Sequence, residues 1–335
     1  MRHLLAALLT LSPVVAHAQP AVESFYKDRP IDLYVPTTPG GTFDIYGRLI
    51  GRFLGRYVPG NPTFVIRNMP GASGMQMLNF LYTTAPRDGS AIGLPPPQSA
   101  VNQIFEMPGV RYDARRFNWL FRIAPVVEVT FTWHTSPTRK IADGFERETL
   151  IGSIGPTSGG SIYMNQLNRL LGARFRIVSG YPGMTEIGLA IERGEVEGTT
   201  KPWAGLKSEN PGWIAEKKVQ LLLTYGRERF HEIPDVPVLG ELAKTDLDRR
   251  VFQFLSSSPA IGRGFITTPG VPAERVAALR AGFMAMSKDA EFLREAEHLS
   301  VDLGPLDGAA LQGLVEEAFS HGPDAVQRAK DASGL

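Results

Sequence analysis

The feature that most constrains the fold is a unit that occurs four times: a short apolar strand, a loop rich in glycine, and an amphipathic helix. The first unit begins at Ile31 and reads IDLYVPTTPGGTFD up to Asp44. After it, apolar residues recur at helical spacing from Ile45 to Tyr57. Alternation of strands and helices predicts right-handed βαβ units, which build a largely parallel sheet covered by helices. The sequence therefore favours the α/β class.

The units form two series, separated by the extended residues 117–135, which are rich in β-branched and aromatic side chains. In chain order the expected strands are 31–36, 63–68, 91–94, 150–153, 175–179, 196–200 and 219–224, with further extended segments at 251–255 and 260–267. The expected helices are 44–57, 74–84, 161–171, 184–193, 273–287, 290–298 and 308–319. Two series joined by crossings near 121–130 and 225–252 predict two lobes with a cleft between them.

The N-terminus has the pattern of a secretory signal peptide. Arg2 and His3 are followed by an apolar run at 4–11, and the sequence AHA at 16–18 fits the small-x-small cleavage rule. The apolar run is too short to span the roughly 30 Å of a bilayer core. We therefore expect residues 1–18 to be a signal peptide cleaved before Gln19, and the mature protein to reside in the periplasm.

Composition excludes several classes of function. The chain has 335 residues and no cysteine, so disulfides, thiol nucleophiles and cysteine-ligated metal centres are absent. Basic and acidic residues number 35 and 34, and no basic face stands out, which argues against nucleic acid as a partner. We expect neither a cofactor nor a metal. A hydrophobic content of 43% suffices for two lobes.

All four glycine-rich loops lie between a strand and a helix, at 37–44, 68–74, 152–161 and 180–184. The first amides of a helix lack internal partners and sit at the positive end of the helix dipole. Glycine lets a ligand approach that backbone, and three of the loops add hydroxyl side chains. These loops favour a small anion held between the lobes. Loops of this composition also occur as plain turns in any α/β protein, and both interpretations remain open at this point.

Enzymatic signatures are weak. Ser73 lies in GASG and Ser158 in PTSGG, and neither has the spacing of a G-x-S-x-G elbow. The sequence has no H-E-x-x-H, Walker A or G-x-G-x-x-G pattern. The histidines of the mature chain are far apart in sequence: His134, His231, His298 and His321. A triad assembled only in three dimensions, or a pair of carboxylates, stays open.

Four polar or aromatic residues lie at two further strand exits. Trp203 and Lys201 follow the expected strand 196–200, where they would either border the cleft or belong to the core and the surface. Gln98 and Ser99 follow the strand 91–94 and are either ligand contacts or turn residues.

The order of the motifs YKDRPIDLYVPTTPGGTFD, RNMPGASG and APRDGSAIG resembles the Bug family, the periplasmic receptors of tripartite tricarboxylate transporters. The second half is similar to the family in its glycine–serine loop at 152–161, in Tyr181 and Gly183, and in the helix PGVPAERVAALRAGFMAM. The resemblance implies a two-lobe periplasmic-binding-protein fold of the Venus flytrap, type II-like kind. It places residues 19–124 and 251–335, including the C-terminal helices, in the first lobe and 125–250 in the second. We expect the last fifteen or so residues to be loosely held.

The resemblance also implies which residues bind a ligand. The first lobe would hold one carboxylate, partly through ordered waters, and the second lobe would discriminate the rest. The residues carried over from the family are Gly40, Gly41, Thr42, Asp44, Gly71, Ala72, Ser73, Ser153, Gly155, Thr157, Ser158, Tyr181 and Gly183. The loops and strand exits themselves add Thr38, Gln98, Ser99, Thr200 and Trp203 to the expected ligand-binding residues. The chain departs from the family at Pro182, where a lysine is usual, at Glu197, where an aspartate is usual, and at Ser73, where a third glycine is usual. These departures leave the ligand unidentified.

The sequence thus predicts a monomeric, non-enzymatic receptor that captures a small carboxylate by lobe closure. Its expected partners are the membrane subunits of a tripartite tricarboxylate-type transporter. The alternatives are an exported serine hydrolase and an orphan receptor that serves a sensor kinase.

Overall fold

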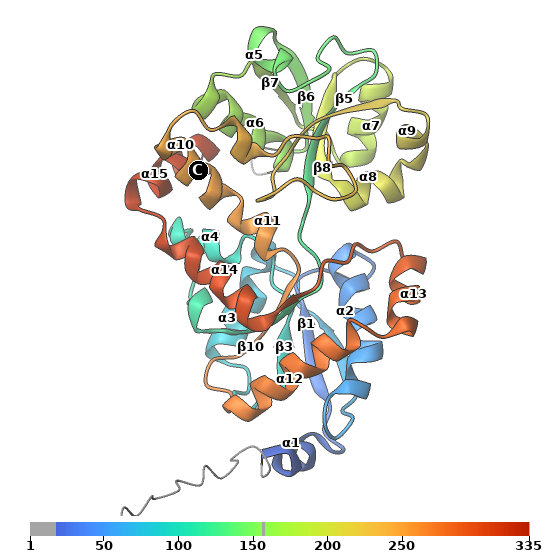
Figure 1. Cartoon of the computed structure of the whole chain (residues 1–335), viewed down its shortest axis with the longest axis vertical. Helices are drawn as coiled ribbons and strands as arrows, with labels where there is room; N and C mark the ends of the chain where they lie inside the picture. The colour runs from blue at the N-terminus through green and yellow to red at the C-terminus, as the bar shows by residue number, and fades with distance from the viewer. Residues whose placement is uncertain (1–17, 156–157, 335) are drawn as a thin grey trace, which may run out of the picture.

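The computed structural model describes residues 18–155 and 158–334 of the chain (Figure 1). The predicted signal peptide lies outside this part except for its last residue, at which helix α1 (Ala18–Tyr26) begins. Cleavage before Gln19 therefore stays a prediction. Within the described residues, no helix combines the length and the apolar character needed to cross a membrane.

Lobe 1 is built on a six-stranded mixed sheet with the order β11-β4-β10-β3-β1-β2. Strands β2 and β3 run parallel to β1, whereas β10 is antiparallel to both β3 and β4, and β11 is antiparallel to β4. The strands are β1 (Ile31–Val35), β2 (Phe64–Asn68), β3 (Ala91–Gly93), β4 (Asn118–Arg122), β10 (Gly264–Thr267) and β11 (Leu306–Asp307). The helices of this half are α2 (Thr42–Phe53), α3 (Met75–Thr83), α4 (Ser99–Ile104), α11 (Ser257–Ile261), α12 (Ala273–Met286), α13 (Ala290–His298) and α14 (Gly308–Ser320).

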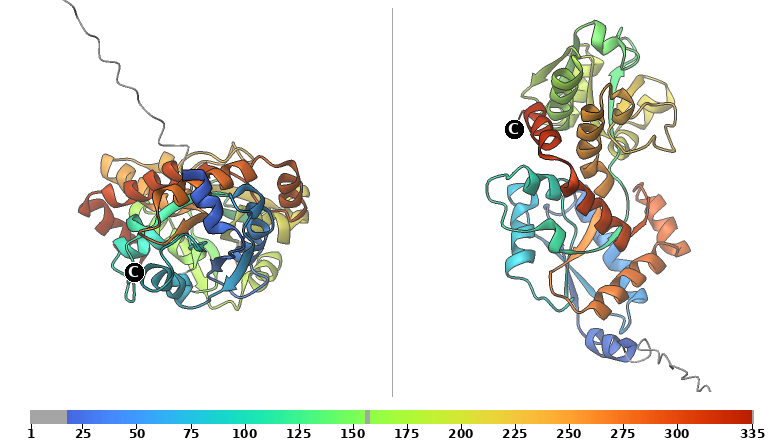
Figure 2. Two further views of the ribbon diagram at one scale, coloured as in Figure 1. Left: turned by 90° about the horizontal axis from the view of Figure 1, so that it is seen from below. Right: turned by 60° about the vertical axis from the view of Figure 1, so that its left-hand side comes forward.

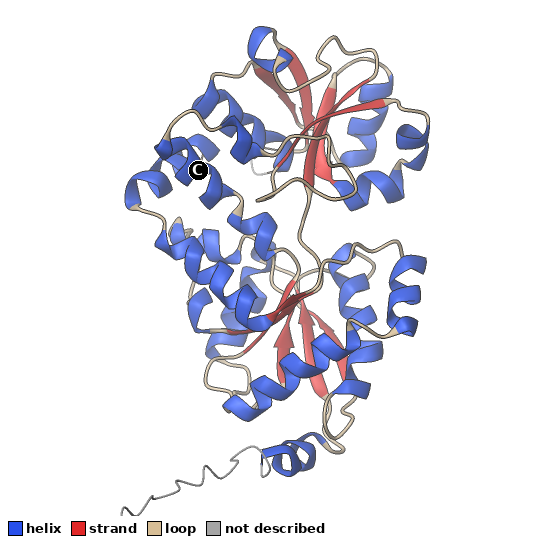
Figure 3. Ribbon diagram, in the orientation of Figure 1, coloured by secondary structure: helices blue, strands red, loops and turns tan. Residues whose placement is uncertain are grey.

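Lobe 2 is built on a five-stranded sheet with the order β7-β6-β8-β5-β9. Strand β6 runs parallel to β7 and β8, and β5 is antiparallel to β8 and β9. The strands are β5 (Glu128–Trp133), β6 (Thr149–Ser153), β7 (Phe175–Ser179), β8 (Gly198–Pro202) and β9 (Val219–Thr224). The helices of this half are α5 (Asp143–Glu146), α6 (Gly159–Leu171), α7 (Met184–Glu192), α8 (Trp203–Glu209), α9 (Pro211–Ala215), α10 (Asp246–Leu255) and α15 (Pro323–Ser333). Helices flank both sheets (Figure 3), so the predicted α/β class is confirmed.

Each lobe has an aromatic core of its own. In lobe 1, the rings of Phe121 and Phe265 both pack on Phe283 of α12, with ring centroids 5.1 Å apart in each pair. In lobe 2, Trp133 of β5 meets Trp213 of α9 edge to face at 4.9 Å. Burying a side chain of this kind stabilises the fold by roughly 2–3 kcal/mol. The lobe 2 core is continuous with α4 of lobe 1, because Phe105 packs on Phe254 of α10 with ring centroids 5.5 Å apart.

Two crossing segments connect the sheets and pair with each other through their backbones. The first runs from β4 to β5 and the second from α11 to β10. The amide of Ile123 donates to the carbonyl of Arg263 at 3.0 Å, and the amide of Arg263 donates to the carbonyl of Ala124 at 2.9 Å. Gly262 has φ +58°, and a Cβ there would lie 2.3 Å from the Ala124 carbonyl oxygen. This close approach admits only glycine and keeps the crossings paired.

The C-terminal helices lie differently from the expectation. Helix α15 packs on α6 and α10, with Ala325 and Ala329 buried in the core of lobe 2, whereas α14 packs on β4 of lobe 1. The right-hand view of Figure 2 shows α15 reaching the upper lobe. The expected loose tail is therefore wrong, because one face of this segment is a stripe of small residues that fits against α6. The division of the chain into lobes at residues 124 and 250 stays a prediction.

One expected extended segment is helical. Residues 251–255 form the end of α10, whose first turn is closed by a capping box in which Thr245 and Asp248 exchange hydrogen bonds. Val251, Phe252 and Phe254 are buried on the apolar side of this helix. Their β-branched and aromatic character suggested a strand, but the cap and the one-sided burial decide for a helix. The short 3₁₀ segments are η2 (Leu54–Tyr57), η3 (Ala72–Gly74), η4 (Ala114–Arg116) and η5 (Leu239–Leu242).

Candidate functional site

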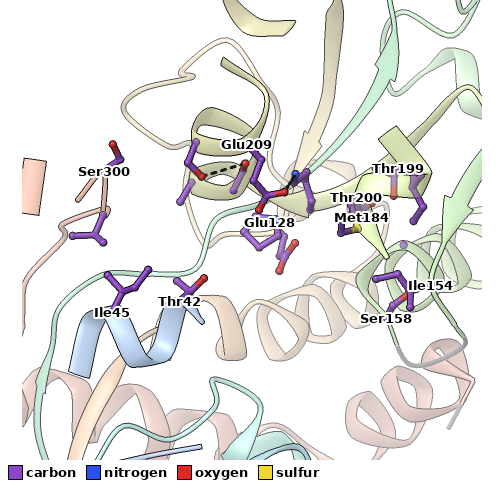
Figure 4. A pocket seen from close by; sticks show the side chains of 18 of the residues that line it. Thr42, Ile45, Glu128, Ile154, Ser158, Met184, Thr199, Thr200, Glu209 and Ser300 are labelled. Carbon is purple, nitrogen blue, oxygen red and sulfur yellow. Dashed lines mark hydrogen bonds and ion pairs between the residues drawn. The ribbon is translucent and has the colours of Figure 1, made fainter. Parts of the chain in front are cut away.

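A cavity of about 380 Å³ lies between the lobes. Lobe 1 contributes Thr42, Ile45 and Tyr46 from α2 and residues 299–301, and lobe 2 contributes Ser153, Ser158 and residues 199–202. Glu128 and Arg263, which follow the two crossings, line it as well. Figure 4 shows Glu128 between Thr42 on one side and Ile154 and Ser158 on the other. Two adjoining cavities, of about 390 and 170 Å³, are also lined by Glu128, which is therefore central to the cleft.

The first glycine loop is organised by Asp44. Its buried carboxylate accepts hydrogen bonds from the Gly40 amide at 2.9 Å, from Arg48 Nε at 2.8 Å and from Asn68 Nδ2 at 3.0 Å. The hydrogen bond from Arg48 lowers the pKa of this carboxyl to about 2, and those from Gly40 and Asn68 act in the same direction against burial. Asp44 thus fixes the loop from inside and occupies the Gly40 amide that we expected to be free for a ligand.

Helix α2 begins without a side-chain cap. Its N-cap is Gly41, and within the described part of the chain no side-chain hydrogen bond caps it. Asp44 does not cap the helix, because its carboxylate points back into the loop. Thr42 instead lines the interlobe cavity. The positive end of this helix faces the site.

The second loop of lobe 1 is a left-handed turn. Gly71, Ala72, Ser73 and Gly74 have φ values of +142°, +45°, +53° and +88°. At Gly74 a Cβ would lie 2.4 Å from Pro96, so the chain needs glycine there. Ser73, at the position where the family has its third glycine, adopts a conformation that costs a non-glycine residue roughly 1–2 kcal/mol. Its side chain borders the 390 Å³ cavity together with Gln98.

The glycine–serine loop of lobe 2 is held by hydroxyl groups. Ser153 Oγ lies 2.7 Å from the hydroxyls of both Ser158 and Ser161, and Ser158 donates to the Gly155 carbonyl at 2.8 Å. Ser153 and Ser158 line the cavity from this cluster. Thr157 lies outside the described residues, and its expected role stays a prediction.

The other expected residues divide between the cavity and its surroundings. Thr200 lines the cavity, and its hydroxyl lies 2.7 Å from that of Thr130. Trp203 is buried behind the cavity and donates its indole N–H to Glu232 at 2.8 Å, and Tyr181 packs on the apolar cluster of lobe 2. The expected residues that line the described cavities are Thr42, Ser73, Gln98, Ser153, Ser158 and Thr200. Those that do not are Thr38, Gly40, Gly41, Asp44, Gly71, Ala72, Ser99, Gly155, Tyr181, Gly183 and Trp203.

Arg263 is a cavity residue that the sequence reasoning missed. Its side chain is 7% exposed, and its guanidinium lies over the ring of Tyr46, 4.6 Å from the centroid. Its Nε is buried without a hydrogen-bond partner among the described residues. A guanidinium presents its N–H donors as a rigid fork and keeps its charge when buried. Arg263 can therefore donate hydrogen bonds to a ligand in the cleft.

Glu128 is the second residue missed. Burial raises the pKa of its carboxyl to about 7, although the charge of Arg263 acts against this rise. Both residues had a signal in the sequence: each is a single charge inside an apolar run, APVVEVTFTW for Glu128 and SPAIGRGFITT for Arg263. A lone charge in a buried run at a lobe crossing indicates a function, because an unpaired buried charge destabilises the fold.

The remaining charges at the cavity are paired. Lys201, which is 5% exposed, donates to Glu209 at 2.8 Å and to Asn210 at 3.3 Å. At the rim, Lys207 of α8 forms ion pairs with Glu232 at 2.7 Å and with Asp302 of lobe 1 at 3.2 Å. The second of these pairs joins the lobes. Among the described residues, no group of three His, Asp or Glu side chains is arranged to hold a metal ion.

Comparisons with known proteins bear on the fold. No family model matches the chain. A UPF0065 protein of the gbd 5′ region of Cupriavidus necator is 25% identical over 250 residues, which are 71% of each chain. A TctC solute-binding protein from Polaromonas superposes with a TM-score of 0.70 at 17% identity, covering 92% of this chain and all of that one.

Two similar structures from Rhodopseudomonas palustris hold ligands. MatC, with bound malate, has a TM-score of 0.60 at 20% identity and covers 91% of this chain and 99% of its own. Rpa4515, with adipate, has a TM-score of 0.62 at 20% identity and covers 90% and 97%. The fold is thus that of the two-lobe periplasmic binding proteins. Within that class it is the fold of the TctC or Bug type, and the resemblance seen in the sequence motifs is confirmed.

Proposed function

We propose that this chain is a periplasmic solute-binding protein that captures a small organic acid between its lobes and delivers it to the membrane subunits of a tripartite tricarboxylate-type transporter. The observation that carries the proposal is Arg263, a buried arginine that lines the interlobe cavity and whose Nε has no hydrogen-bond partner among the described residues. A carboxylate would give it a bidentate partner. The similar proteins MatC and Rpa4515 hold malate and adipate, both of which are carboxylates.

The other polar groups of the cavity fit the same ligand class. Thr42 at the start of α2 and the hydroxyls of Ser153, Ser158 and Thr200 supply hydrogen bonds from both lobes. A ligand that contacts both lobes binds the closed arrangement more tightly than an open one and so shifts the population toward closure. The closed form would then engage the transporter as a monomer. No chemical step is needed for this function.

The test begins with native mass spectrometry of freshly purified protein, followed by a thermal-shift screen of mono-, di- and tricarboxylates and aromatic acids. We expect at least one acid to raise the melting temperature in a concentration-dependent way. Failure of every acid in the screen to stabilise the protein contradicts the proposal. Ester hydrolysis by the pure protein, lost on replacing one serine, favours the hydrolase alternative instead.

The role of Arg263 is tested with the best acid of the screen. Arg263→Met removes the charge, and Arg263→Lys keeps it but removes the fork. A hydrogen bond to a charged group is worth about 1.5–3 kcal/mol, so Arg263→Met should weaken binding by about 10- to 150-fold, and Arg263→Lys by less. Arg87→Met is the matched control, because Arg87 is an exposed arginine outside the cavity. Equal affinity of Arg263→Met and Arg87→Met excludes Arg263 as the carboxylate-binding group.

A further inference from the structure

Glu128 and Arg263 bring one charge of each sign to the floor of the same cavity. Glu128 begins β5 directly after the first crossing, and Arg263 precedes β10 directly after the second. Both side chains line the 380 Å³ cavity and the adjoining 390 Å³ cavity. Within residues 18–155 and 158–334 neither side chain forms an ion pair, with the other or with any other residue. Two side chains of opposite charge thus line the same cavity without forming an ion pair with each other.

The arrangement has a cost that a ligand can remove. A charge that is removed from water and has no partner destabilises a folded protein by up to several kcal/mol. An ion pair between Glu128 and Arg263, or replacement of either residue by a neutral one, would remove this penalty. A ligand that carries both charges would satisfy each group with its opposite. A dicarboxylate would satisfy Arg263 alone and would bring a second negative charge toward Glu128.

The groups that face Glu128 leave its carboxylate available to a ligand. The rings of Tyr163 and Tyr225 stack beside it with centroids 3.8 Å apart, and burial raises the pKa of both hydroxyls, so they are neutral. Tyr225 shares its hydroxyl with Thr130 at 2.8 Å. Lys201 is engaged by Glu209. Arg263 is the cation whose charge acts on Glu128, and it is held over Tyr46 instead.

We propose that the ligand of this cleft is a small zwitterion, an amino-carboxylate, whose carboxylate binds Arg263 and whose ammonium group binds Glu128. This inference rests on the proposed function, because it assumes that Arg263 holds a carboxylate, and it adds the class of the second group. The ammonium donates hydrogen bonds to the Glu128 carboxylate, which is half-buried in the cleft. There a charge-assisted hydrogen bond is stronger than in water.

The experiment compares pairs of compounds that differ only in the amino group. A panel of α- and ω-amino acids, each beside the acid that lacks the amine, is titrated against the full mature chain by calorimetry at about pH 8, where Glu128 is ionised. We expect amino acids to bind at least about tenfold more tightly than their partners, since losing a charged hydrogen bond has that effect. Glu128→Gln should abolish the difference while still binding plain carboxylates. Glu274→Gln, an exposed glutamate at the start of α12, is the control.

Proton linkage supplies a readout that a purely structural role of Glu128 would not move. Because burial raises the pKa of Glu128 to about 7, only about a tenth of it is ionised at pH 6. The affinity for an amino acid should therefore fall about five- to tenfold from pH 8 to pH 6 in the wild type, and should not change in Glu128→Gln.

The outcomes separate this inference from the proposed function. Deaminated acids that bind as tightly as their amino acids, or a Glu128→Gln variant that still prefers the amine, overturn the zwitterion while the carboxylate receptor stands. If neither class of compound binds, both proposals are wrong. Both proposals are supported if Arg263→Met binds neither amino acids nor plain acids, and Glu128→Gln still binds acids but no longer prefers those with an amino group.

Discussion

Replacing Glu128 with glutamine removes a half-buried negative charge and keeps the size of the side chain. Burial raises the pKa of this carboxyl from 4.5 to about 7, so the folded protein holds its proton more tightly than the unfolded chain does. Each pH unit of such a difference corresponds to about 1.4 kcal/mol. Below pH 4.5 Glu128 is protonated in both states and does not destabilise the fold. As the pH rises from 4.5 through 7, the unfolded chain loses this proton more readily than the folded protein, so the free energy of unfolding falls. The wild type should therefore lose about 3 kcal/mol of unfolding free energy between about pH 4 and pH 8 through this one group.

The assay is the melting temperature of the ligand-free protein, measured by circular dichroism at several pH values for the wild type and for Glu128→Gln. The variant lacks the titrating group, so its melting temperature relative to that of the wild type should increase as the pH rises. Between pH 5 and pH 8 the free energies of unfolding of the variant and the wild type should diverge by about 2.5 kcal/mol, which for a chain of this size corresponds to roughly 4 °C. We therefore expect the melting-temperature difference between variant and wild type to be larger at about pH 8 than at about pH 5 by that amount. Glu274→Gln should show no such trend.

Two results would refute the reasoning about Glu128. A difference between variant and wild type that stays constant from about pH 5 to pH 8 means that the carboxyl is not buried in the ligand-free protein. A variant that loses stability relative to the wild type toward high pH means that the ionised carboxylate has a stabilising partner.

Three further predictions follow from the loop, the crossings and the rim. Asp44→Asn should lower the free energy of unfolding by roughly 1–2 kcal/mol near pH 7. Because hydrogen bonds lower the pKa of Asp44 to about 2, the difference in melting temperature between variant and wild type should shrink as the pH falls from 4 to 2. A difference that does not change with pH would contradict this role of Asp44. Gly262→Ala introduces a Cβ 2.3 Å from the Ala124 carbonyl oxygen at a positive φ, so it should destabilise the protein by about 2–4 kcal/mol, and a melting temperature equal to that of the wild type would be incompatible with the paired crossings. Lys207→Met removes the ion pair to lobe 1, worth about 0.5–1 kcal/mol, and should increase the radius of gyration of the ligand-free protein in X-ray scattering. Lys218→Met, whose pair with Glu216 lies within lobe 2, should leave that radius unchanged, and equal curves for both variants would rule out a latch at Lys207.

Much of the fold could be predicted because its signals are local. Strands β1, β2, β6, β7 and β9 and helices α2, α3, α6, α7, α12 and α13 lie within a few residues of their expected bounds, since periodicity and loop composition define them one at a time. The end of α10 and the position of α15 were not predictable in this way. The end of α10 packs on α15, and α15 packs on α6, so both depend on contacts between segments far apart in the sequence.

The same distinction holds at the candidate site. The loops that carry Thr42, Ser73, Ser153 and Ser158 reach the cavity, because a loop that follows a parallel strand necessarily lies at the carboxyl edge of the sheet. Local sequence did not reveal that the Asp44 carboxylate is used inside its own loop. Nor did it bring Glu128 and Arg263 together, since they are 135 positions apart and meet only where the crossings pair.

The most direct test of the account is a crystal structure of the protein with the acid that stabilises it most in the thermal-shift screen. We predict that the ligand lies in the interlobe cavity with its carboxylate within hydrogen-bond distance of the Arg263 guanidinium, and near the hydroxyls of Ser153 and Thr200. A ligand bound elsewhere, or bound in the cleft with Arg263 still unpartnered, would contradict the central claim.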